Sequence, residues 1–277
     1  MSRRPSTRSL TLRYALLVIV FLISIGPFLW QLSTSLKGIG EDIYSYPPSL
    51  LPLQPTLHNY ARVSEVVPVF HFALNSLIAA SMSVVANCAG ASMAGYALAR
   101  LRFRGRKLAF LTIVAGLLVP LESILISQFL LVRSLGLNNT LIAVILPGAV
   151  GALNVLLMRN AFLGFPHEVE EAALIDGATA WQRFFRIGLP AVKGTIAVVA
   201  LFAFVGVWDD FLWPLIVLSD PDRYTLTVGL DYLEGQFAQD QRLIAAGTII
   251  AVAPLIVLFV FLQRFFFRGV GEGAVKG

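Results

Sequence analysis

Six apolar segments constrain this chain more than any other feature of its sequence, because each is long enough to cross a lipid bilayer. A spanning helix needs about 20 predominantly apolar residues. The segments cover residues 14–36, 69–99, 108–132, 140–158, 191–216 and 243–267. They predict an all-α integral membrane protein with six transmembrane helices, whose membrane domain extends over residues 14–267.

The composition excludes a soluble globular domain. Hydrophobic residues make up 57% of the chain and charged residues only 13%, whereas soluble domains carry about 25% charged residues. A net charge of +5 also suits a nucleic-acid-binding protein, but the basic residues stand in short clusters between the apolar segments. Membrane topology explains such clusters, so we expect membrane lipid and no nucleic acid as a partner.

The N-terminus combines features of a signal peptide and of a first membrane span. Arginines at positions 3, 4, 8 and 13 precede the first apolar segment. That segment is long enough to span the membrane, and no convincing A-x-A cleavage site follows it. We therefore expect an uncleaved first span, preceded by a short segment of residues 1–13.

The distribution of Lys and Arg predicts the orientation in the membrane. Sixteen of the 21 basic residues lie in or next to the terminal segments and the second and fourth connections. Basic residues accumulate on the cytoplasmic side of membrane proteins. We therefore expect residues 1–13, the connection 159–190 and the tail 268–277 in the cytoplasm.

The connection 159–190 has the pattern of a helix–turn–helix rather than of a bare polar loop. Pro166 suits the first position of a helix, and acidic residues close behind it suit the positive end of the helix dipole. These acidic residues are Glu168, Glu170 and Glu171. Asp176-Gly177 indicates the end of this first helix.

A second helix is predicted in the same connection. Thr179 and Gln182 have capping-box spacing for its start, and Leu189-Pro190 marks its end. Three aromatic side chains at i, i+3 and i+4 share one face of it. They are Trp181, Phe184 and Phe185. We expect them to pack against the chain's own spans or to anchor the helix at the membrane surface.

The pattern of this hairpin resembles the EAA loop of bacterial ABC-importer permeases. The matching positions are Glu171-Ala172-Ala173, Gly177, Ile187 and Leu189-Pro190. The form EAALIDGAT, with Asp176 before Gly177, is similar to the carbohydrate (MalG-like) branch of that family. An ordinary amphipathic hairpin lying at the membrane surface is the alternative interpretation.

Further stretches extend the resemblance over most of the chain. In chain order they are Asn75-Ser76-Leu77, GYALARLRFRGR, Pro120, LGLNNT, MRNAFLGFP, WDDFLWPLIVL and QRFFFRGVGEGAVKG. Asp209 stands where the family usually has Asn, and Gly271-Glu272 stands where it usually has Thr-Ala. Residues 14–68 match only generically.

The resemblance implies a type I ABC-importer permease fold, with the helix–turn–helix as a cytoplasmic coupling loop. It implies a non-enzymatic, multi-pass subunit in the inner or plasma membrane of a prokaryote that helps to import a sugar or sugar derivative. The implied partners are an ABC ATPase subunit dimer, a second homologous permease subunit and an extracytoplasmic solute-binding protein. ATP and Mg would be bound by the ATPase, and this chain would hold no cofactor.

The residues that the resemblance assigns to ATPase coupling also have suitable chemistry. They are Glu171, Ala172, Ala173, Asp176, Gly177, Ala178, Leu189 and Pro190. The Glu171 carboxylate can accept hydrogen bonds from a partner, and the two alanines keep the helix slim enough to enter a groove. Gly177 permits a backbone conformation that a Cβ would obstruct.

Motifs for catalysis are absent from the sequence. It contains no G-x-x-x-x-G-K-[ST] motif, so energy from ATP must arrive through another subunit. It contains no H-E-x-x-H and no G-x-S-x-G motif either. His58, His71 and His167 lack metal-ligand spacing, so we expect no metal site.

Polar residues inside apolar segments are costly and are therefore candidates for function. Glu122 follows Pro120, and a proline-broken helix with a carboxylate can line a water-filled cavity. Asn154 lies in the fourth segment. We expect Glu122 and Asn154 to line the transport pathway. Asn87 stands among small residues and is expected to mark close helix packing.

Trp208, Asp209 and Asp210 lie near the end of the fifth segment, which places them close to the outer membrane face. They are candidates for an outer gate or a docking point. Because Trp213 is also nearby, a belt of interfacial aromatic side chains is the alternative interpretation.

Two other functional classes are alternatives to the importer. A secondary transporter, which works without ATP, would have inverted repeats and deep ion-binding carboxylates. The sequence has no clear internal repeat, and only Glu122 is reasonably deep. An intramembrane enzyme would need a nucleophile–base pair or a metal cluster, and the sequence indicates neither.

Overall fold

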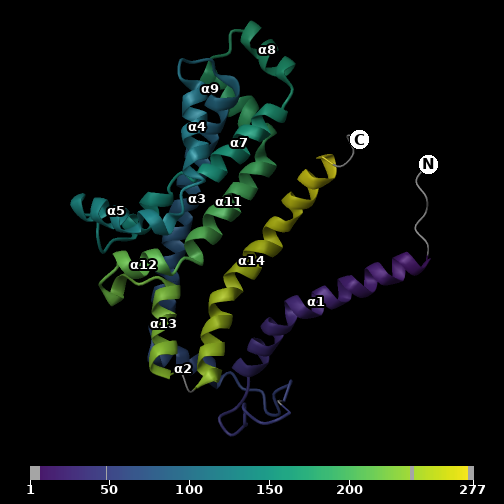
Figure 1. The fold of residues 1–277 in the computed structure, drawn as a ribbon, viewed down its shortest axis with the longest axis vertical. Helices are drawn as coiled ribbons and strands as arrows, with labels where there is room; N and C mark the ends of the chain where they lie inside the picture. The colour runs from purple at the N-terminus through teal and green to yellow at the C-terminus, as the bar shows by residue number, and fades with distance from the viewer. Residues whose placement is uncertain (1–6, 48, 238–239, 274–277) are drawn as a thin grey trace. The chain divides into compact units, whose positions relative to one another are not determined.

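The computed structural model describes residues 7–47, 49–237 and 240–273, and this part of the chain is helical with no strand (Figure 1). The longer helices are α1 (Thr7–Ser35), α3 (Val69–Arg100), α11 (Lys193–Trp208) and α14 (Gln241–Gly273). The shorter helices are α2 (His58–Val66), α4 (Arg106–Gly116), α5 (Leu121–Ser134), α6 (Leu141–Ile145), α7 (Ala152–Gly164), α8 (His167–Ile175), α9 (Ala180–Arg183), α10 (Leu189–Ala191), α12 (Leu212–Val217) and α13 (Leu226–Phe237). Between them lie the 3-10 helices η1 (Leu146–Gly148) and η3 (Pro221–Arg223) and the π-helix η2 (Phe184–Gly188). The predicted all-α class is confirmed.

The segments predicted as N-terminus and tail, 1–13 and 268–277, lie partly outside the described residues.

Three helices of the described chain are long and apolar enough to cross a membrane, namely Leu10–Ser35, Val69–Arg100 and Gln241–Phe261. Three further pairs of helices pass the same test only when each pair is taken as one bent span. The pairs bend by 105° between α4 and α5, by 49° between the α6–η1 segment and α7, and by 80° between the α9–α10 run and α11. By length and composition, the described residues therefore contain three candidate spans, or up to six if each bent pair is one span.

The sharpest bend follows from a proline. Pro120 has φ −62° and ψ 132°, an extended conformation, and it is the residue immediately before α5. A proline cannot donate a backbone hydrogen bond, and it disfavours the helical conformation of the residue before it. The predicted apolar segment 108–132 is therefore two helices, as expected of a helix broken at Pro120.

The end of α7 shows the difference between the edge of an apolar segment and the end of a helix. The predicted apolar segment stops at residue 158, but α7 continues to Gly164. Arg159 is a good helix former, and its guanidinium lies 4.2 Å from the ring centroid of Phe110. The helix ends where the chain turns extended at Phe165 and Pro166, because the residue before a proline favours extended backbone.

The chain consists of two compact units. The first contains Met1–Val69 and Leu230–Ala253, and the second contains Phe70–Gly229 and Pro254–Gly277. In the first unit, Asn59 donates from Nδ2 to the carbonyls of Ser35 and Lys37, each at 2.8 Å. Lys37 is fully buried and donates to the carbonyl of Ser49 at 2.6 Å. These contacts hold the irregular segment that follows α1.

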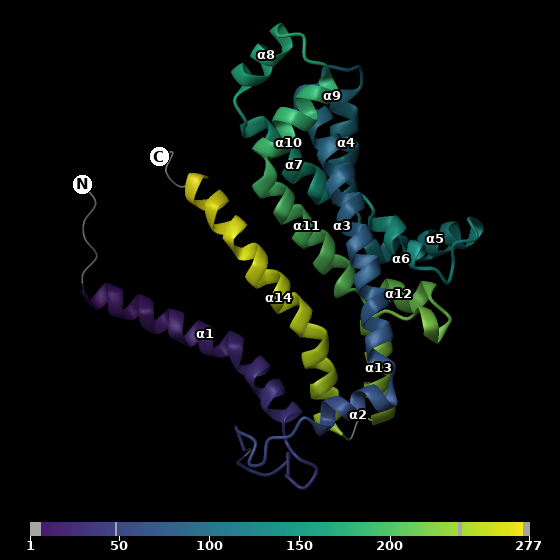
Figure 2. The same cartoon turned by 180° about the vertical axis from the view of Figure 1, so that it is seen from behind.

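In the second unit, α3 lies directly against α7 and the segment that precedes it (Figures 1 and 2). A Cβ added to Gly90 would stand 2.4 Å from the Val150 side chain. A Cβ on Gly95 would stand 2.7 Å from Cβ of Met158 and 2.8 Å from the backbone nitrogen of Arg159. The predicted close packing around Asn87 is confirmed, because only glycine allows these backbones to approach so closely.

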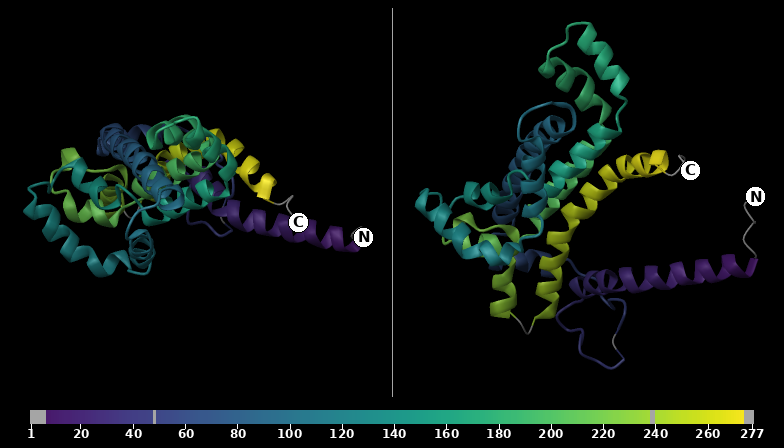
Figure 3. Two further views of the ribbon diagram at one scale, coloured as in Figure 1. Left: turned by 90° about the horizontal axis from the view of Figure 1, so that it is seen from above. Right: turned by 45° about the horizontal axis from the view of Figure 1, so that its top comes forward.

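The core of the second unit gathers aromatic and aliphatic side chains from α3, α7, η2 and α11. Its larger buried members are Tyr96, Met158, Phe162, Phe184 and Val199. The hairpin formed by α8 and α9, green in Figure 3, continues from α7 and leads back into η2, α10 and α11. The core thus lies at the base of the hairpin that the sequence singles out. All of the predicted site residues belong to this second unit.

Candidate functional site

The first arm of the hairpin is α8, which begins one residue later than the sequence predicts and ends at the predicted Asp176-Gly177. Pro166 occupies the N-cap position with extended backbone, and Glu168 and Glu170 lie in the first turn. These carboxylates suit the positive end of the helix dipole. Of the nine residues of α8, only Glu170 is buried. The rest of the helix is therefore free to contact a partner.

The turn after α8 is a Schellman motif. Gly177 has φ +81°, and its N–H donates to the carbonyl of Leu174 at 3.1 Å. The N–H of Ala178 donates to the carbonyl of Ala173 at 2.9 Å. This pair of bonds, with a left-handed glycine, ends a helix sharply. No atom lies within 4 Å of a Cβ added to Gly177, so the backbone conformation and not crowding requires glycine here.

Most of the predicted coupling residues gather on the exposed surface of this arm. Glu171 is 62% exposed and lies 3.1 Å from Nδ1 of His167, one turn earlier. Ala172, Asp176 and Gly177 are exposed, Ala173 and Ala178 are partly exposed, and Ile175 is 86% exposed at the end of the helix. The surface therefore combines one carboxylate, small side chains and a prominent apolar residue.

Leu189 and Pro190 lie apart from that surface. Both belong to α10, which follows the π-helix η2. Leu189 packs against the core at the base of the hairpin, whereas Pro190 is exposed. The structure therefore places the predicted coupling residues in two groups, one on α8 and its turn and one at the base.

The second arm begins with the predicted capping box. The N–H of Gln182 donates to Oγ1 of Thr179 at 3.2 Å, and the N–H of Thr179 donates to Oε1 of Gln182 at 2.8 Å. The three aromatic side chains that follow form one cluster, in which the Phe184 ring centroid lies 6.1 Å from that of Trp181 and 4.8 Å from that of Phe185, but they differ in burial. Phe184 is buried, with its ring centroid 5.2 Å from that of Tyr96. Trp181 and Phe185 are exposed, and they stack with their ring centroids 5.7 Å apart. Phe184 thus belongs to the core that it shares with α3 and α7.

Glu170 is a functional candidate that sequence reasoning missed. Its carboxylate lies 3.1 Å from Nε of Arg100 and 3.7 Å from Nη1 of Arg183, and it accepts a hydrogen bond from the Tyr96 hydroxyl. Arg100 and Glu170 are almost fully buried. The sequence carried one signal, since Tyr96 and Arg100 stand one turn apart on α3 and present polar groups on one face.

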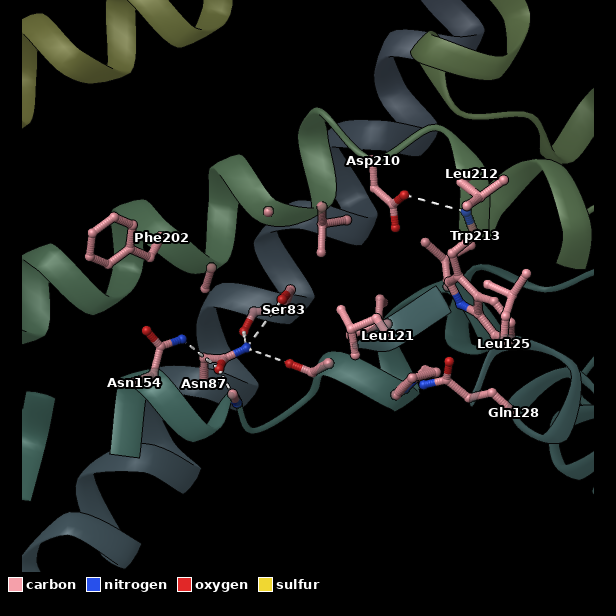
Figure 4. Close-up of a pocket in the computed structure, with 18 of the residues that line it drawn as sticks. Ser83, Asn87, Leu121, Leu125, Gln128, Asn154, Phe202, Asp210, Leu212 and Trp213 are labelled. Carbon is pink, nitrogen blue, oxygen red and sulfur yellow. Dashed lines mark hydrogen bonds between the residues drawn. The ribbon is translucent and has the colours of Figure 1, made fainter. Parts of the chain in front are cut away.

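A second candidate site is a cavity of about 330 Å³ bounded by α3, α5, α7, α11 and α12 (Figure 4). Ligand pockets commonly have volumes of about 300–1,000 Å³. Asn87 forms the centre of its polar wall. Its Oδ1 accepts from the N–H of Gly151 at 2.8 Å, and its Nδ2 donates to the carbonyl of Gly148 at 2.9 Å. Asn154 donates from Nδ2 to the same Oδ1 at 2.8 Å.

The two predicted pathway residues, Glu122 and Asn154, line this one cavity. Glu122 is exposed in the first turn of α5, just after the break at Pro120. Asn154 is buried on α7, and its Oδ1 has no hydrogen-bond partner. The opposite wall carries Phe202 of α11 together with Asp210 (Figure 4). The cavity therefore presents both amide and carboxylate groups.

The three predicted gate residues have different environments. Trp208 is 3% exposed and stacks on Phe204, with the ring centroids 5.5 Å apart. Asp209 is exposed, whereas Asp210 is half-buried, lines the cavity and accepts from the N–H of Trp213 at 3.4 Å. Trp213 is 8% exposed. A lipid-facing aromatic belt does not fit this burial, because both tryptophans lie in the interior of the unit.

Comparisons with known proteins agree with this architecture. The family described as binding-protein-dependent transport system inner membrane component matches residues 86–272. The arabinooligosaccharides transport system permease protein of Halalkalibacterium halodurans is 38% identical over 88% of this chain and 86% of its own length. The diacetylchitobiose uptake system permease protein of Streptomyces coelicolor is 33% identical over 97% of this chain and 90% of its own length. A crystal structure of a bacterial ABC transporter involved in the import of the acidic polysaccharide alginate contains a chain of the same fold, with a TM-score of 0.82. The two sequences are 24% identical, and the match covers 96% of this chain and 100% of that chain.

Proposed function

The chain belongs to the family of binding-protein-dependent transport system inner membrane components, and on that premise we propose that it conducts a sugar or sugar derivative as one permease subunit of an ATP-driven ABC importer. The subunit is not the enzyme of the importer. ATP and Mg are bound and ATP is hydrolysed in a separate subunit.

The exposed surface of α8 is the observation that carries the coupling part of the proposal. A slim amphipathic helix enters a groove of a partner with its small residues against the groove walls. Ile175 supplies an exposed apolar side chain, and Glu171 supplies an exposed carboxylate on the same helix. The left-handed Gly177 ends the helix without adding bulk. We assign this surface to the ATPase subunit.

The cavity lined by Glu122 and Asn154 supports the transport part of the proposal. Its lining combines the amide groups of Asn87 and Asn154 with the carboxylates of Glu122 and Asp210, and both kinds of group can hydrogen-bond the hydroxyl groups of a sugar. The relatives reported above are permeases for arabinooligosaccharides and diacetylchitobiose. The cavity is proposed as this chain's share of the pathway, with Trp208, Asp209 and Asp210 as its outer gate.

The proposed assembly contains four kinds of subunit. A second, homologous permease completes the pathway, two ATPase subunits bind the hairpins from the cytoplasm, and an extracytoplasmic solute-binding protein delivers the sugar. Both termini and the α8 hairpin face the cytoplasm in this arrangement, as the distribution of basic residues predicts. ATP binding closes the ATPase pair, moves the hairpins and turns the pathway outward.

A pull-down in mild detergent tests the proposal. The tagged chain is purified from its native membrane, the eluate is assayed for ATP hydrolysis, and the co-purifying chains are identified. We expect a second permease and an ATPase in the eluate, and loss of the ATPase from an Ala172→Lys variant. A lone chain that transports sugar in liposomes along an ion gradient without ATP would overturn the importer in favour of a secondary transporter.

A further inference from the structure

We infer that Glu170 is a positioning residue that transmits the motion of the α8 hairpin to α3, separately from the surface that docks the ATPase. The inference rests on the proposed function, because it assigns a role within the importer cycle. The exposed surface of α8, which includes Glu171, receives the force exerted by the ATPase subunit. Glu170 transmits that force into the membrane part of the chain.

The burial of α8 is the first observation. Glu170 is the only buried residue of this helix, and the flanking residues Val169 and Glu171 are exposed. A helix whose other side chains point to solvent or are only partly covered has little packing of its own against the unit. Its mechanical connection at this end therefore depends on one side chain.

The partners of Glu170 come from both the hairpin and the membrane part. Arg100 at the end of α3 contacts the carboxylate through Nε at 3.1 Å. Arg183 on the second arm contacts it through Nη1 at 3.7 Å. The Tyr96 hydroxyl donates to it from the preceding turn of α3. One carboxylate thus joins α8, α9 and α3.

Arg100 also fixes the chain between α7 and α8. Its Nη2 donates to the carbonyl of Phe162 at 2.5 Å and to the carbonyl of Phe165. Phe162 lies in the last turn of α7 and Phe165 is its C-cap, so Arg100 binds carbonyls at the point where the chain leaves this helix. A displacement of Glu170 therefore acts on the end of α3 and the end of α7 together.

The support beneath the carboxylate is rigid. The ring of Tyr96 lies against Phe162 and Phe184, with centroids 5.3 Å and 5.2 Å apart. Close-packed interiors transmit strain because they have little compressibility. A carboxylate without such support would move without displacing its neighbours. The Glu170 carboxylate is held between two arginines above an aromatic cluster, so its displacement moves them as well.

A substitution that removes the negative charge of Glu170 distinguishes transmission of the motion from docking of the ATPase subunit. Glu170→Gln keeps the size of the side chain and leaves the exposed surface of α8 unchanged, but it removes the charge that holds Arg100 and Arg183. Glu65→Gln is the matched control, because Glu65 is an exposed glutamate on α2, outside the hairpin, and the substitution removes the same charge. Each variant is reconstituted in liposomes as the complete importer complex with its binding protein.

Three quantities are measured, namely the amount of co-purified ATPase subunit, the rate of ATP hydrolysis and the sugar taken up per ATP hydrolysed. We expect Glu170→Gln to retain the ATPase subunit and to lower the uptake per ATP by about tenfold, a change typical of coupling between sites. Glu65→Gln should match the wild-type complex in all three.

A second variant keeps the test decisive if Glu170→Gln is poorly produced. Tyr96→Phe removes one hydrogen-bond donor to Glu170 and leaves the aromatic ring in place. It should also lower the uptake per ATP, by a smaller factor. Wild-type uptake per ATP in either well-assembled variant overturns the role of Glu170 as a transmitter. Loss of the ATPase subunit from Glu170→Gln also overturns it, because that residue would then belong to the docking surface. A wild-type complex that contains no ATPase would instead reject the proposed function itself.

Discussion

Asn154 on α7 donates a 2.8 Å hydrogen bond to Oδ1 of Asn87 on α3, and this bond decides which atom of the Asn154 amide has no hydrogen-bond partner. Asn87 cannot turn its amide around, because Oδ1 accepts from the N–H of Gly151 while Nδ2 donates to the carbonyl of Gly148. Asn154 must therefore be the donor in the pair. Its Oδ1 remains as an acceptor beside the cavity, without a hydrogen bond in this conformation.

We predict that Asn154→Leu impairs sugar uptake without destabilising the protein. Leucine removes a buried acceptor that has no partner, and Asn87 retains its bonds to the backbone. A sugar hydroxyl would lose one hydrogen bond, which contributes about 0.5–1.5 kcal/mol. The KM for uptake should rise, up to about tenfold. The control is Asn160→Leu, on an exposed position of the same helix. An unchanged KM would remove Asn154 from the pathway.

In contrast to Asn154→Leu, Asn87→Leu should mainly lower the stability of the folded protein. The N–H of Gly151 and the carbonyl of Gly148 would both lose their partner inside the protein. The buried Nδ2 of Asn154 would lose its acceptor as well, and an unsatisfied buried group of this kind costs about 1–3 kcal/mol, whereas the exposed carbonyl of Gly148 can bond to water. The Tm of the purified chain in detergent should fall well below that of Asn154→Leu. Equal Tm values for the two variants would contradict the structural role assigned to Asn87.

The contact between α3 and α7 predicts a strong difference between two glycine-to-alanine substitutions. Gly95→Ala would place a methyl group 2.8 Å from the backbone nitrogen of Arg159, which cannot move aside like a flexible side chain. Such overpacking costs about 1–3 kcal/mol. Gly194→Ala in α11 has no atom within 4 Å of the new Cβ and should be neutral or stabilising, by about 0.5–1 kcal/mol. Thermal unfolding of both variants in detergent measures the difference, and equal midpoints would argue against this helix contact.

The left-handed turn at Gly177 predicts that Gly177→Asn is tolerated and Gly177→Val is not. Asparagine adopts a positive φ more readily than other residues with a side chain, whereas a β-branched residue is a strong outlier there. Open space surrounds this position, so any loss reflects the backbone and not a clash. The valine variant should reshape the end of α8 and recover less ATPase subunit in a pull-down. Equal recovery of the ATPase by both variants would show that the shape of this turn does not matter for docking.

Local signals in the sequence were sufficient to predict the hairpin. Gly177 and Thr179 act through their nearest neighbours, so a left-handed stop and a capping box can be read from the residues around them. The break at Pro120 is local in the same way. The matching helix ends in the structure confirm these three expectations.

Long-range contacts could not be predicted in this way. Glu170 and Glu171 are neighbours of identical chemistry, and only the position of α3 decides that one is buried and the other exposed. The burial of Trp208 and Trp213 likewise depends on how distant helices pack. The size of the 105° bend between α4 and α5 depends on the same packing. A charge or an aromatic ring indicates what a residue can do, and the tertiary structure decides whether it does so.

The π-helix from Phe184 to Gly188 has a consequence for the phase of the second arm. A π-turn accommodates about one residue more than an α-turn, and each residue advances an α-helix by about 100°. A helical wheel drawn from Thr179 onward is therefore correct up to Phe184 and rotated by about 100° for every later residue. Leu189 reaches the core only on the shifted wheel. A one-residue deletion within the π-helix would restore ordinary α-helical winding and leave that side chain in the core, whereas a one-residue deletion in an α-helical stretch would rotate every later side chain by about 100°.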